Sequence, residues 1–539
     1  MKYHHSLKRA LASVMLAVLF TATLAAASNL PLPSREEMSS INASDLKKHL
    51  SFLASDELGG RFTFSPSNRI AARYIASQLE SYGYKGAARD GSFFQKVPLQ
   101  YSSPDTVNSR VTLHSGSEKL EFKYGDAFIS TGGINTDISG ALVFAGYGIS
   151  SPKNNHDDYA GLDVKGKIVV IVDGVPSSLG KVSIGAEERD ADAALAHGAK
   201  GAITILSAPA MLQWNELKLL LTRNEQLGLP SRATRSGKIL PAITAGPDLV
   251  KAIAKAMGKD SSYLMTLGKP LQPMSLTTTA DIKMKATVKE APPAQNVTAM
   301  LEGSDPKLKD QYIVFSAHYD HLMSSDSGEV YNGADDDGSG TVSVLEIAQA
   351  FAVGPRPKRS ILIIFHTGEE LGLFGSEFNT DYEPVVPLEK LVADFNIDMI
   401  GRTRRESDTD PRDRDLTDKD SVYVIGADKL STELNKLSEE TNADTARLKF
   451  DYKYNDENHP EHFYYRSDHY NYAKHGVPII FYFTGVHRDY HKTTDDVDKI
   501  DFEKMERITR MIFALGWRVA NLDHRLVVDK KPSNLNPPQ

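Results

Sequence analysis

The spacing of hydrophobic and polar positions changes along this chain, and the changes divide it into regions. Residues 46–58 and 67–84 repeat apolar side chains at helical spacing, and the second run meets Gly83, a residue type that ends helices. From about residue 130 the pattern changes to short apolar runs between glycines, typical of buried strands, at residues 139–148, 166–174 and 198–206. Two amino-terminal helices followed by a β-rich region are therefore predicted.

A second change in the pattern comes near Pro292-Pro293. A less regular region, about 210–290, ends at this proline pair, which we interpret as a linker. From Gln295 onward, strand-like apolar runs alternate with helical patterns. Such alternation predicts an α/β fold with a mostly parallel central sheet and helices on both of its faces.

These changes predict a main domain in two parts, with a second domain inserted between them. The main domain would comprise residues 35–130 and 286–525, and the insertion, a β-rich α/β domain, would comprise residues 131–285. Residues 526–539 are polar and rich in proline, so we expect a disordered tail.

The first 27 residues have the features of a secretory signal peptide. Basic Lys2, Lys8 and Arg9 precede an apolar stretch, and Ala25-Ala26-Ala27 offers a small-residue cleavage site. A retained membrane helix is the alternative, but the apolar stretch is short and interrupted by hydroxyl side chains. We expect an exported protein, periplasmic or secreted, with no membrane attachment after cleavage.

Composition and charge narrow the classes of partner. The 539 residues are 41% hydrophobic and 24% charged, which is ordinary globular composition. The chain has no cysteine, so disulfides, cysteine-bound zinc and a thiol nucleophile are excluded. The net charge of −8 becomes −11 without the signal segment, which holds three positive charges and no acidic residue. This balance argues against nucleic acid or an anionic membrane as partner.

Histidines and carboxylates lie in or directly after several of the strand-like runs, among them residues 312–317, 361–368 and 394–397. In an open α/β sheet the ends of parallel strands face one crevice, where ligands bind. Residues distant in sequence can therefore meet there. Two histidines and three carboxylates suit zinc, with manganese and cobalt as alternatives. The candidates for these ligands and for the carboxylates beside them are His318, Asp320, Asp336, Glu369, Glu370, Asp398 and His491.

Spacing suggests different tasks for some of these residues. His318 and Asp320 are two apart, so on a strand both would point to one face, where one could bind metal and the other accept its ring N–H. Of the adjacent Glu369 and Glu370, one could bind metal while the other acts as a base. Asp398 follows an apolar run, where a lone carboxylate is costly unless it is paired or bound to metal.

The acidic triplet Asp335-Asp336-Asp337 also fits a calcium-binding loop. Counted from Asp335, acidic residues fall at positions 1 and 3, Ser339 at 5, Gly340 at 6 and Glu346 at 12, nearly as in an EF-hand. However, no helical pattern precedes the loop and no second copy exists. Glu346 lies within a helical pattern, residues 341–351, where we expect it on the solvent-exposed face.

Taken together, the motifs resemble those of a known family. In order they are SAHYDH, GADDDGSG, GEELGLFGS, NIDMIG, RSDHY and YHKTTDD. They resemble the two-zinc exopeptidases that include bacterial leucyl aminopeptidase, aminopeptidase Y and glutamate carboxypeptidase. The resemblance covers roughly residues 40–130 and 285–520, which makes the main domain the catalytic domain. The inserted region is similar to a protease-associated domain.

The resemblance implies two zinc ions per chain and a ligand set for each. His318 and Asp398 would hold one ion. Glu370 and His491 would hold the other. Asp336 would bridge the two.

The same resemblance implies the chemistry around the metal ions. Glu369 would be the general base, acting on a water whose pKa the zinc ions lower. Asp320 would orient His318. Tyr490 occupies a place where some members have a tyrosine that steadies the oxyanion. The resemblance also places Asp468 of the RSDH motif near the site, but we assign it no role in the reaction.

The resemblance implies a peptide substrate and, in particular, an aminopeptidase that releases amino-terminal residues. A carboxypeptidase, a one-zinc glutaminyl cyclase and a non-catalytic binding protein on the same scaffold are the alternatives. The inserted domain would frame the cleft or serve as a spacer. The sequence does not determine the oligomeric state.

Overall fold

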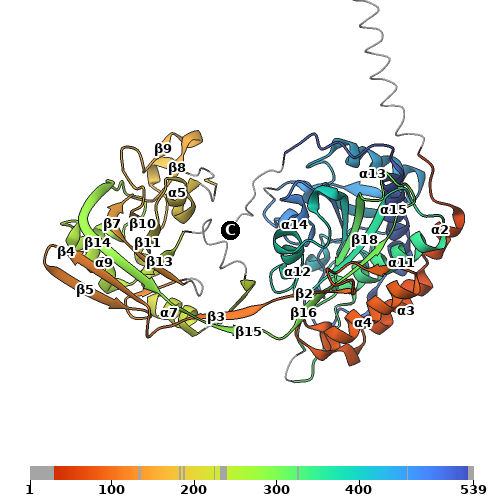
Figure 1. The fold of residues 1–539 in the computed structure, drawn as a ribbon, viewed down its shortest axis with the longest axis horizontal. Coiled ribbons are helices and arrows are strands. Elements are labelled where there is room, and N and C mark those ends of the chain that lie inside the picture. The colour runs from red at the N-terminus through yellow and green to blue at the C-terminus, as the bar shows by residue number, and fades with distance from the viewer. Residues whose placement is uncertain are drawn as a thin grey trace, which may run out of the picture. The chain divides into compact units, whose positions relative to one another are not determined.

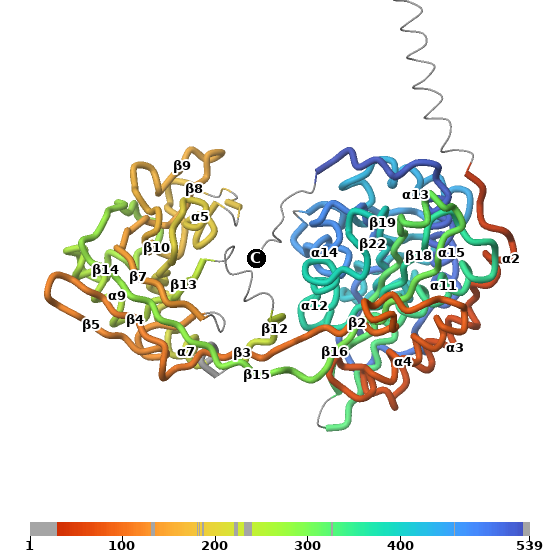
Figure 2. Tube along the Cα trace, in the orientation of Figure 1, coloured from red at the N-terminus to blue at the C-terminus, as the bar shows by residue number. Residues whose placement is uncertain are grey.

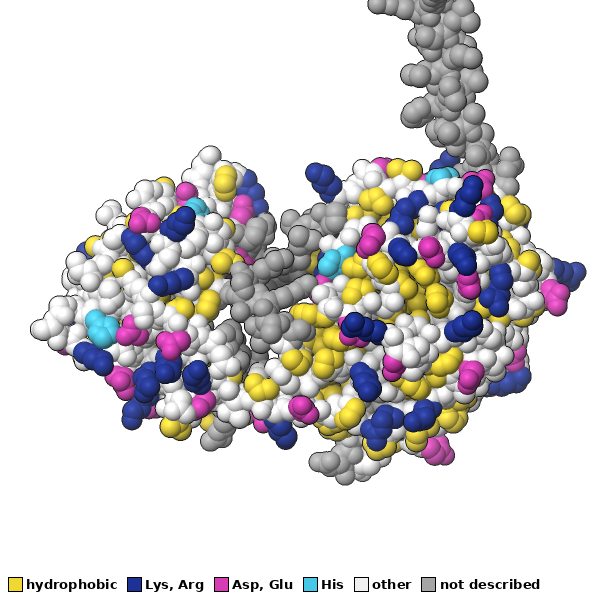
Figure 3. All heavy atoms as spheres, viewed as in Figure 1, with side chains coloured by type: hydrophobic (Ala, Val, Ile, Leu, Met, Phe, Trp, Pro, Cys, Tyr) yellow, Lys and Arg dark blue, Asp and Glu magenta, His cyan; other side chains and the backbone are white. Residues whose placement is uncertain are grey.

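The computed structural model describes residues 30–531, except 131–134, 181, 183, 186–187, 224, 231–239, 325–326 and 458. The expected signal peptide, residues 1–27, lies outside the described residues. Among the described residues, no helix has both the length and the apolar character needed to cross a membrane. Acidic and basic side chains are mixed over the face shown in Figure 3.

The chain forms two compact units that interrupt each other in sequence. The first unit contains the residues up to Val97 and those from Pro293, and the second contains residues 98–292. The break between Pro292 and Pro293 coincides with the linker expected there. Residues 98–130, which we expected in the main domain, belong instead to the second unit, because their strands pair within its sheets.

One nine-stranded sheet organises the first unit (Figure 1). Its four central strands, in the order β18-β17-β19-β22, run parallel, and antiparallel neighbours flank them on both sides. The α/β class predicted from the sequence is confirmed. The strands are β1 (Lys85–Gly86), β2 (Phe94–Val97), β16 (Ala294–Leu301), β17 (Tyr312–His318), β18 (Ser360–His366), β19 (Leu391–Ile397), β20 (Ser421–Ile425), β21 (Lys449–Asp451) and β22 (Ile479–Phe483).

Helices cover both faces of this sheet. Alternate residues of β17 enter different cores: Phe315 packs in the core that contains α11 and α15, and Val314 packs in the core that contains α14. In Figure 1, α12 and α14 lie on the opposite side of β18 from α11 and α15. The helices are α2 (Arg35–Ser40), α3 (Ala43–Leu53), α4 (Pro66–Ser81), α11 (Gly340–Val353), α12 (Phe374–Glu377), α13 (Thr432–Asp444), α14 (His469–Ala473) and α15 (Phe502–Asn521).

The two helices predicted near the amino terminus are α3 and α4. Proline occupies the first turn of α4, where its missing N–H is not needed, and the hydroxyl of Ser65 caps the helix. Gly83 follows with φ +84°, the left-handed conformation that ends a helix.

An eight-stranded sheet organises the second unit, in the order β5-β4-β14-β7-β10-β11-β13-β6. The buried strand expected at residues 198–206 is confirmed as β11, which follows α5 and a turn at Gly198. The region that we expected to be less regular contains α7, α9, α10, β13, β14 and β15. The larger elements are β3 (Gln100–Pro104), β4 (Arg110–Ser115), β5 (Glu118–Lys123), β6 (Phe128–Ile129), β7 (Thr136–Phe144), β10 (Ile168–Val172), β11 (Gly201–Ile205), β12 (Gln226–Gly228), β13 (Ala242–Ala245), β14 (Met274–Met284), β15 (Ala286–Glu290), α5 (Asp190–Ala196), α7 (Trp214–Arg223), α9 (Pro247–Ala256) and α10 (Ser261–Leu264).

The start of the expected disordered tail is bound to the first unit. Leu526 is buried in its core, and Asp529 accepts hydrogen bonds from the backbone and hydroxyl of Thr432. The backbone N–H groups of Asp529 and Lys530 donate to the Leu430 carbonyl. Residues 526–531 are therefore ordered, contrary to our expectation, and the rest of the tail lies outside the described residues.

The two segments of the first unit meet in its sheet where the second unit is inserted. The second unit can therefore be deleted and the ends of the first unit joined. Val97 of β2 pairs with Ala294 of β16, and these strands run side by side in Figure 2. Replacing residues 98–292 by a short glycine-rich turn should leave a unit that unfolds in one cooperative transition, because each unit has its own core. Thermal unfolding followed by circular dichroism checks this, and a variant without a transition would contradict it.

Candidate metal centre

Three neighbouring parallel strands bring most of the predicted ligands together. His318 is the last residue of β17, Asp398 follows the end of β19, and the pair Glu369-Glu370 lies in the loop after β18. Because these strands are parallel and adjacent, their carboxyl ends lie at one edge of the sheet. The strand order thus explains why residues so distant in sequence meet.

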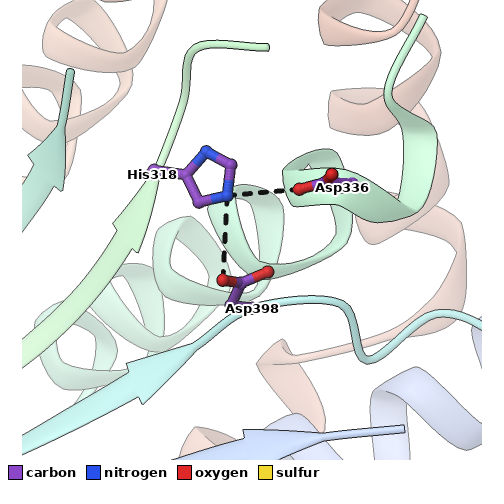
Figure 4. Close-up of side chains that lie close together, drawn as sticks. All are labelled: His318, Asp336 and Asp398. Atoms are coloured by element: carbon purple, nitrogen blue, oxygen red, sulfur yellow. Dashed lines mark ion pairs between the residues drawn. The ribbon is translucent and has the colours of Figure 1, made fainter. Parts of the chain in front are cut away.

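Asp336 lies between two histidines. Its Oδ1 is 3.3 Å from Nε2 of His318, and its Oδ2 is 3.1 Å from Nε2 of His491. Asp398 approaches the same ring nitrogen of His318 from a different direction, with 3.8 Å between Oδ2 and Nε2 (Figure 4). Glu370 places Oε2 3.1 Å from Nε2 of His491. The five predicted ligands therefore converge, with Asp336 at the centre.

The donor set fits divalent cations. His318, Asp336 and Asp398 offer one group of converging ligand atoms, and His321, Asp336 and Glu370 offer another. Four carboxylates gather around the histidines, since Glu369 lies 3.9 Å from His318 Nε2. The side chains of Glu369 and Glu370 are 12% and 6% exposed, the other carboxylates and His318 and His321 are buried, and His491 is 36% exposed. So many buried carboxylates are unfavourable unless cations balance their charge.

The pKa shifts within this cluster show how strongly its charges interact. Burial favours the neutral form of Asp336, but hydrogen bonds with His318 and His491 outweigh it and hold the pKa of the carboxyl well below its usual range. The opposite effect appears on His491. Its burial would lower the pKa, but the carboxylates of Asp336 and Glu370 raise it to about 10. The site therefore favours positive charge at these ring nitrogens, as a metal ion would provide.

Comparison with known proteins supports a peptidase. Residues 296–516, which contain all the predicted site residues, match the model described as Peptidase family M28. This segment is similar to the peptidases of family M28. The family resemblance inferred from the motifs is thereby confirmed.

Several relatives of the chain have names that include an aminopeptidase activity. Aminopeptidase YwaD of Bacillus subtilis is 34% identical over 122 residues, 23% of this chain and 25% of that protein. The probable leucine aminopeptidase of Arthroderma otae is 26% identical over 234 residues, 42% of this chain and 57% of that protein. The chain thus spans between a quarter and three-fifths of the length of these two relatives.

Solved structures similar to this chain include two bacterial aminopeptidases. The aminopeptidase from Aneurinibacillus sp. strain AM-1 is 21% identical, with a TM-score of 0.44, over 92% of this chain and 99% of that one. The zinc aminopeptidase BSAP from Bacillus subtilis is 20% identical, with a TM-score of 0.41, over 88% and 94%.

The outer two acids of the triplet Asp335-Asp336-Asp337 hold the backbone. Asp337 accepts hydrogen bonds from the N–H groups of Met399, Gly340 and His318, and Asp335 accepts one from Gly401. The peptide between Asp336 and Asp337 is cis. Among these three acids, Asp336 is the one whose carboxylate faces His318 and His491.

The position of Glu346 does not fit a calcium-binding loop. Our expectation that Glu346 is solvent-exposed was also wrong. It is fully buried in α11, with its carboxylate 3.4 Å from Nε2 of His49. The helix packs between other helices on this side, so this position faces α3 rather than water. The acidic residues at the loop's first, third and twelfth positions thus have separate partners.

Asp320 differs in detail from the predicted arrangement. Nδ1 of His318 lies 3.1 Å from the main-chain oxygen of Asp320 and 3.9 Å from its carboxylate. The carboxylate instead accepts hydrogen bonds from the Thr63 hydroxyl and from the N–H of Glu369. Asp320 therefore fixes the backbone at Glu369, and its carbonyl fixes the tautomer of His318.

Glu369 is the carboxylate of this cluster that lines a cavity without belonging to either ligand group. Burial, together with the neighbouring carboxylates, raises the pKa of Glu369 well above its usual range. A carboxylate with a raised affinity for protons can serve as a base near neutral pH.

Our sequence reasoning missed His321. The side chain of His321 is fully buried. Its Nδ1 lies 2.6 Å from Oε1 of Glu370 and 3.7 Å from Oδ2 of Asp336. The signal was present, since His321 is the second histidine of the AHYDH motif. Strand periodicity would place it opposite His318, but β17 ends at His318 and the periodicity does not continue.

Replacement of His321 tests its role. His321→Phe should lower zinc affinity about 10- to 100-fold, because the variant no longer holds the carboxylate of Glu370 in place. Titration of zinc against a chelator measures this. The exposed His524→Gln is the matched control and should bind zinc normally. Unchanged affinity in His321→Phe would show that Glu370 needs no such support.

A cavity opens beside the metal-ligand cluster. His318, Asp336, Glu369 and Asp398 line one part of it. Tyr490 lines it too, and its ring stacks on His491 with 3.8 Å between the ring centroids. The remaining wall is mostly apolar, formed by Met399, Phe463, Phe481, Phe483 and Val486, with Arg466 and Ser467.

Proposed function

We propose that this protein is an exported, zinc-dependent aminopeptidase that removes amino-terminal residues from peptides. The observation that carries the proposal is the position of Asp336 between His318 and His491, beside a cavity that Glu369 also lines. The M28 match and the names of the relatives support a peptidase.

Two zinc ions would complete the site. His318 and Asp398 would hold one, Glu370 and His491 the other, and Asp336 would contact both. When bound, the zinc ions would supply a Lewis acid for the peptide carbonyl and lower the pKa of water. His321 would fix the Glu370 carboxylate through the contact described above.

The protein's own groups would then handle the proton and the substrate. Glu369 would take a proton from the attacking water and pass it to the leaving amine. Tyr490, stacked on His491 at the cavity wall, would donate a hydrogen bond to the developing oxyanion. The aromatic part of the cavity would receive an apolar side chain, because burying it there removes apolar surface from water.

A carboxypeptidase remains the second candidate because Arg466 also lines the cavity. A guanidinium could bind the substrate's terminal carboxylate. Arg466, however, lies 3.6 Å from Glu461 and over the ring of Phe463, so its charge already has partners. The carboxylates of Glu369 and Asp398, which also line the cavity, favour a substrate amine instead.

Substrates with one end blocked separate these candidates. We expect hydrolysis of leucine arylamide and no hydrolysis of amino-blocked peptides with a free carboxylate, because the carboxylates of the lining attract an amine. Release of arylamine and of free amino acid would be measured. The reverse preference would indicate a carboxypeptidase.

Metal removal tests the cofactor. Chelation should abolish activity and lower the melting temperature, since a ligand that binds only the folded state stabilises it by about 4 kcal/mol at a thousandfold excess over its Kd. Zinc should restore both. Metal analysis of the purified protein should give two zinc ions per chain. Activity unaffected by chelation would exclude the metallopeptidase proposal.

We also propose export through the signal peptide at residues 1–27, and a protease-associated domain in the second unit. Amino-terminal sequencing of the mature protein from its native host would test the first. The deletion of residues 98–292 would test the second, because a domain that shapes substrate choice should alter the preference among peptides when it is removed.

A further inference from the structure

Arg402 connects the three segments that carry most of the proposed ligands. It lies four residues after Asp398, and its side chain is almost fully buried. One guanidinium nitrogen donates to Asp489 over 2.5 Å, and another lies 3.3 Å from Asp495. Neither acid is a proposed ligand.

Asp489 belongs to the segment of His491, two residues before that ligand. Its other carboxylate oxygen accepts hydrogen bonds from Thr494 and Lys499, so the carboxylate closes the turn that carries His491. His491 itself has φ +55°, a conformation that non-glycine residues adopt only when their surroundings fix it. The Arg402 contact is part of those surroundings.

Asp495 holds the segment of Asp336. Its Oδ2 accepts the N–H groups of Asp335 and Asp336, and its main-chain oxygen accepts that of Ala334. Three consecutive backbone donors next to the central carboxylate thus depend on one residue. Arg402 lies against the other oxygen of the same carboxylate.

We propose that Arg402 is a positioning residue that sets the distance between His491 and Asp336, and through them the zinc affinity of the centre. A guanidinium suits this role because its planar fork reaches two carboxylates in fixed directions, whereas an ammonium is a single point charge. Arg402 acts through Asp489 and Asp495 and does not touch the substrate. The inference rests on the proposed two-zinc function.

Zinc affinity, measured on the full chain, distinguishes positioning from general stability. Arg402→Gln should bind zinc about 10- to 100-fold more weakly, the usual effect of losing a residue that supports metal ligands. Arg518→Gln is the matched control. Arg518 is another buried arginine, bonded to Thr441 and Asp444, and neither is a proposed ligand or next to one. The control should lose stability but keep its zinc affinity within about twofold.

Each outcome bears on the inference. Folded Arg402→Gln protein with zinc affinity within twofold of the unsubstituted chain would overturn it. If that variant does not fold, Asp489→Asn weakens the Arg402 contact to the His491 segment and leaves the contact between Arg402 and Asp495 in place. Normal binding of both zinc ions by Asp489→Asn would then overturn the inference. Arg402→Lys should recover part of the lost affinity. An unsubstituted chain that binds no zinc would instead refute the proposed function.

Discussion

Glu369→Gln should fold and bind zinc like the unsubstituted chain while losing about 10²- to 10⁴-fold in kcat, the usual contribution of a general base. The amide has nearly the same size as the carboxylate but cannot accept the proton. The N–H of Glu369 that donates to Asp320 belongs to the backbone and remains. Steady-state kinetics with an amino-acid arylamide, alongside metal analysis, measures both expectations.

The control for this variant is Glu389→Gln, which changes an exposed glutamate outside the cavity lining. Its kcat should not change. If Glu369→Gln turned over at near-normal rates, another group would have to be the base. If it lost zinc as well as activity, Glu369 would be a ligand rather than a base.

Asp336→Asn should remove most of the bound zinc and reduce kcat/KM on the order of 10³-fold or more, because one carboxylate faces both histidines. An amide offers one neutral oxygen in place of two that share a negative charge. Asp398→Asn is the informative comparison. Asp398 faces only one of the two proposed histidine ligands, His318, so its replacement should cost one zinc ion. Metal analysis after equilibrium dialysis measures the two contents.

Retention of both zinc ions by Asp336→Asn would refute the bridging role. Equal losses in the two variants would have a different meaning. They would show that the two metal sites depend on each other, so that neither ion binds firmly without its neighbour.

Much of the fold could be predicted from the sequence because hydrophobic periodicity is a local property. The runs at 312–317, 361–368 and 394–397 read as buried strands, and they are β17, β18 and β19 with small shifts at their ends. Because the ends of parallel strands face one crevice, the pattern predicted that residues following them could meet there. That His318 lies beside Asp398 was implied by the family resemblance, and the pairing of β17 with β19 places them so.

The domain boundary near residue 130 could not be found in this way. Residues 98–130 form short strands with ordinary alternation, and strands of that kind suit either unit. Their partners decide where they belong: β4 pairs with β14, whose residues lie more than 150 positions later in the chain. Pairing over such a distance leaves no trace in local periodicity.

The sequence by itself determined which residues could bind metal and at which edge of the sheet they would gather. Only the tertiary structure decided what supports them: His321 beside Glu370, the Asp320 carbonyl beside His318, and Arg402 beside Asp489 and Asp495. The physical reason is that apolar burial follows a repeat along the chain, whereas a buried polar group takes whichever partner the fold brings within hydrogen-bond distance. For Arg402 those partners lie 87 and 93 residues away.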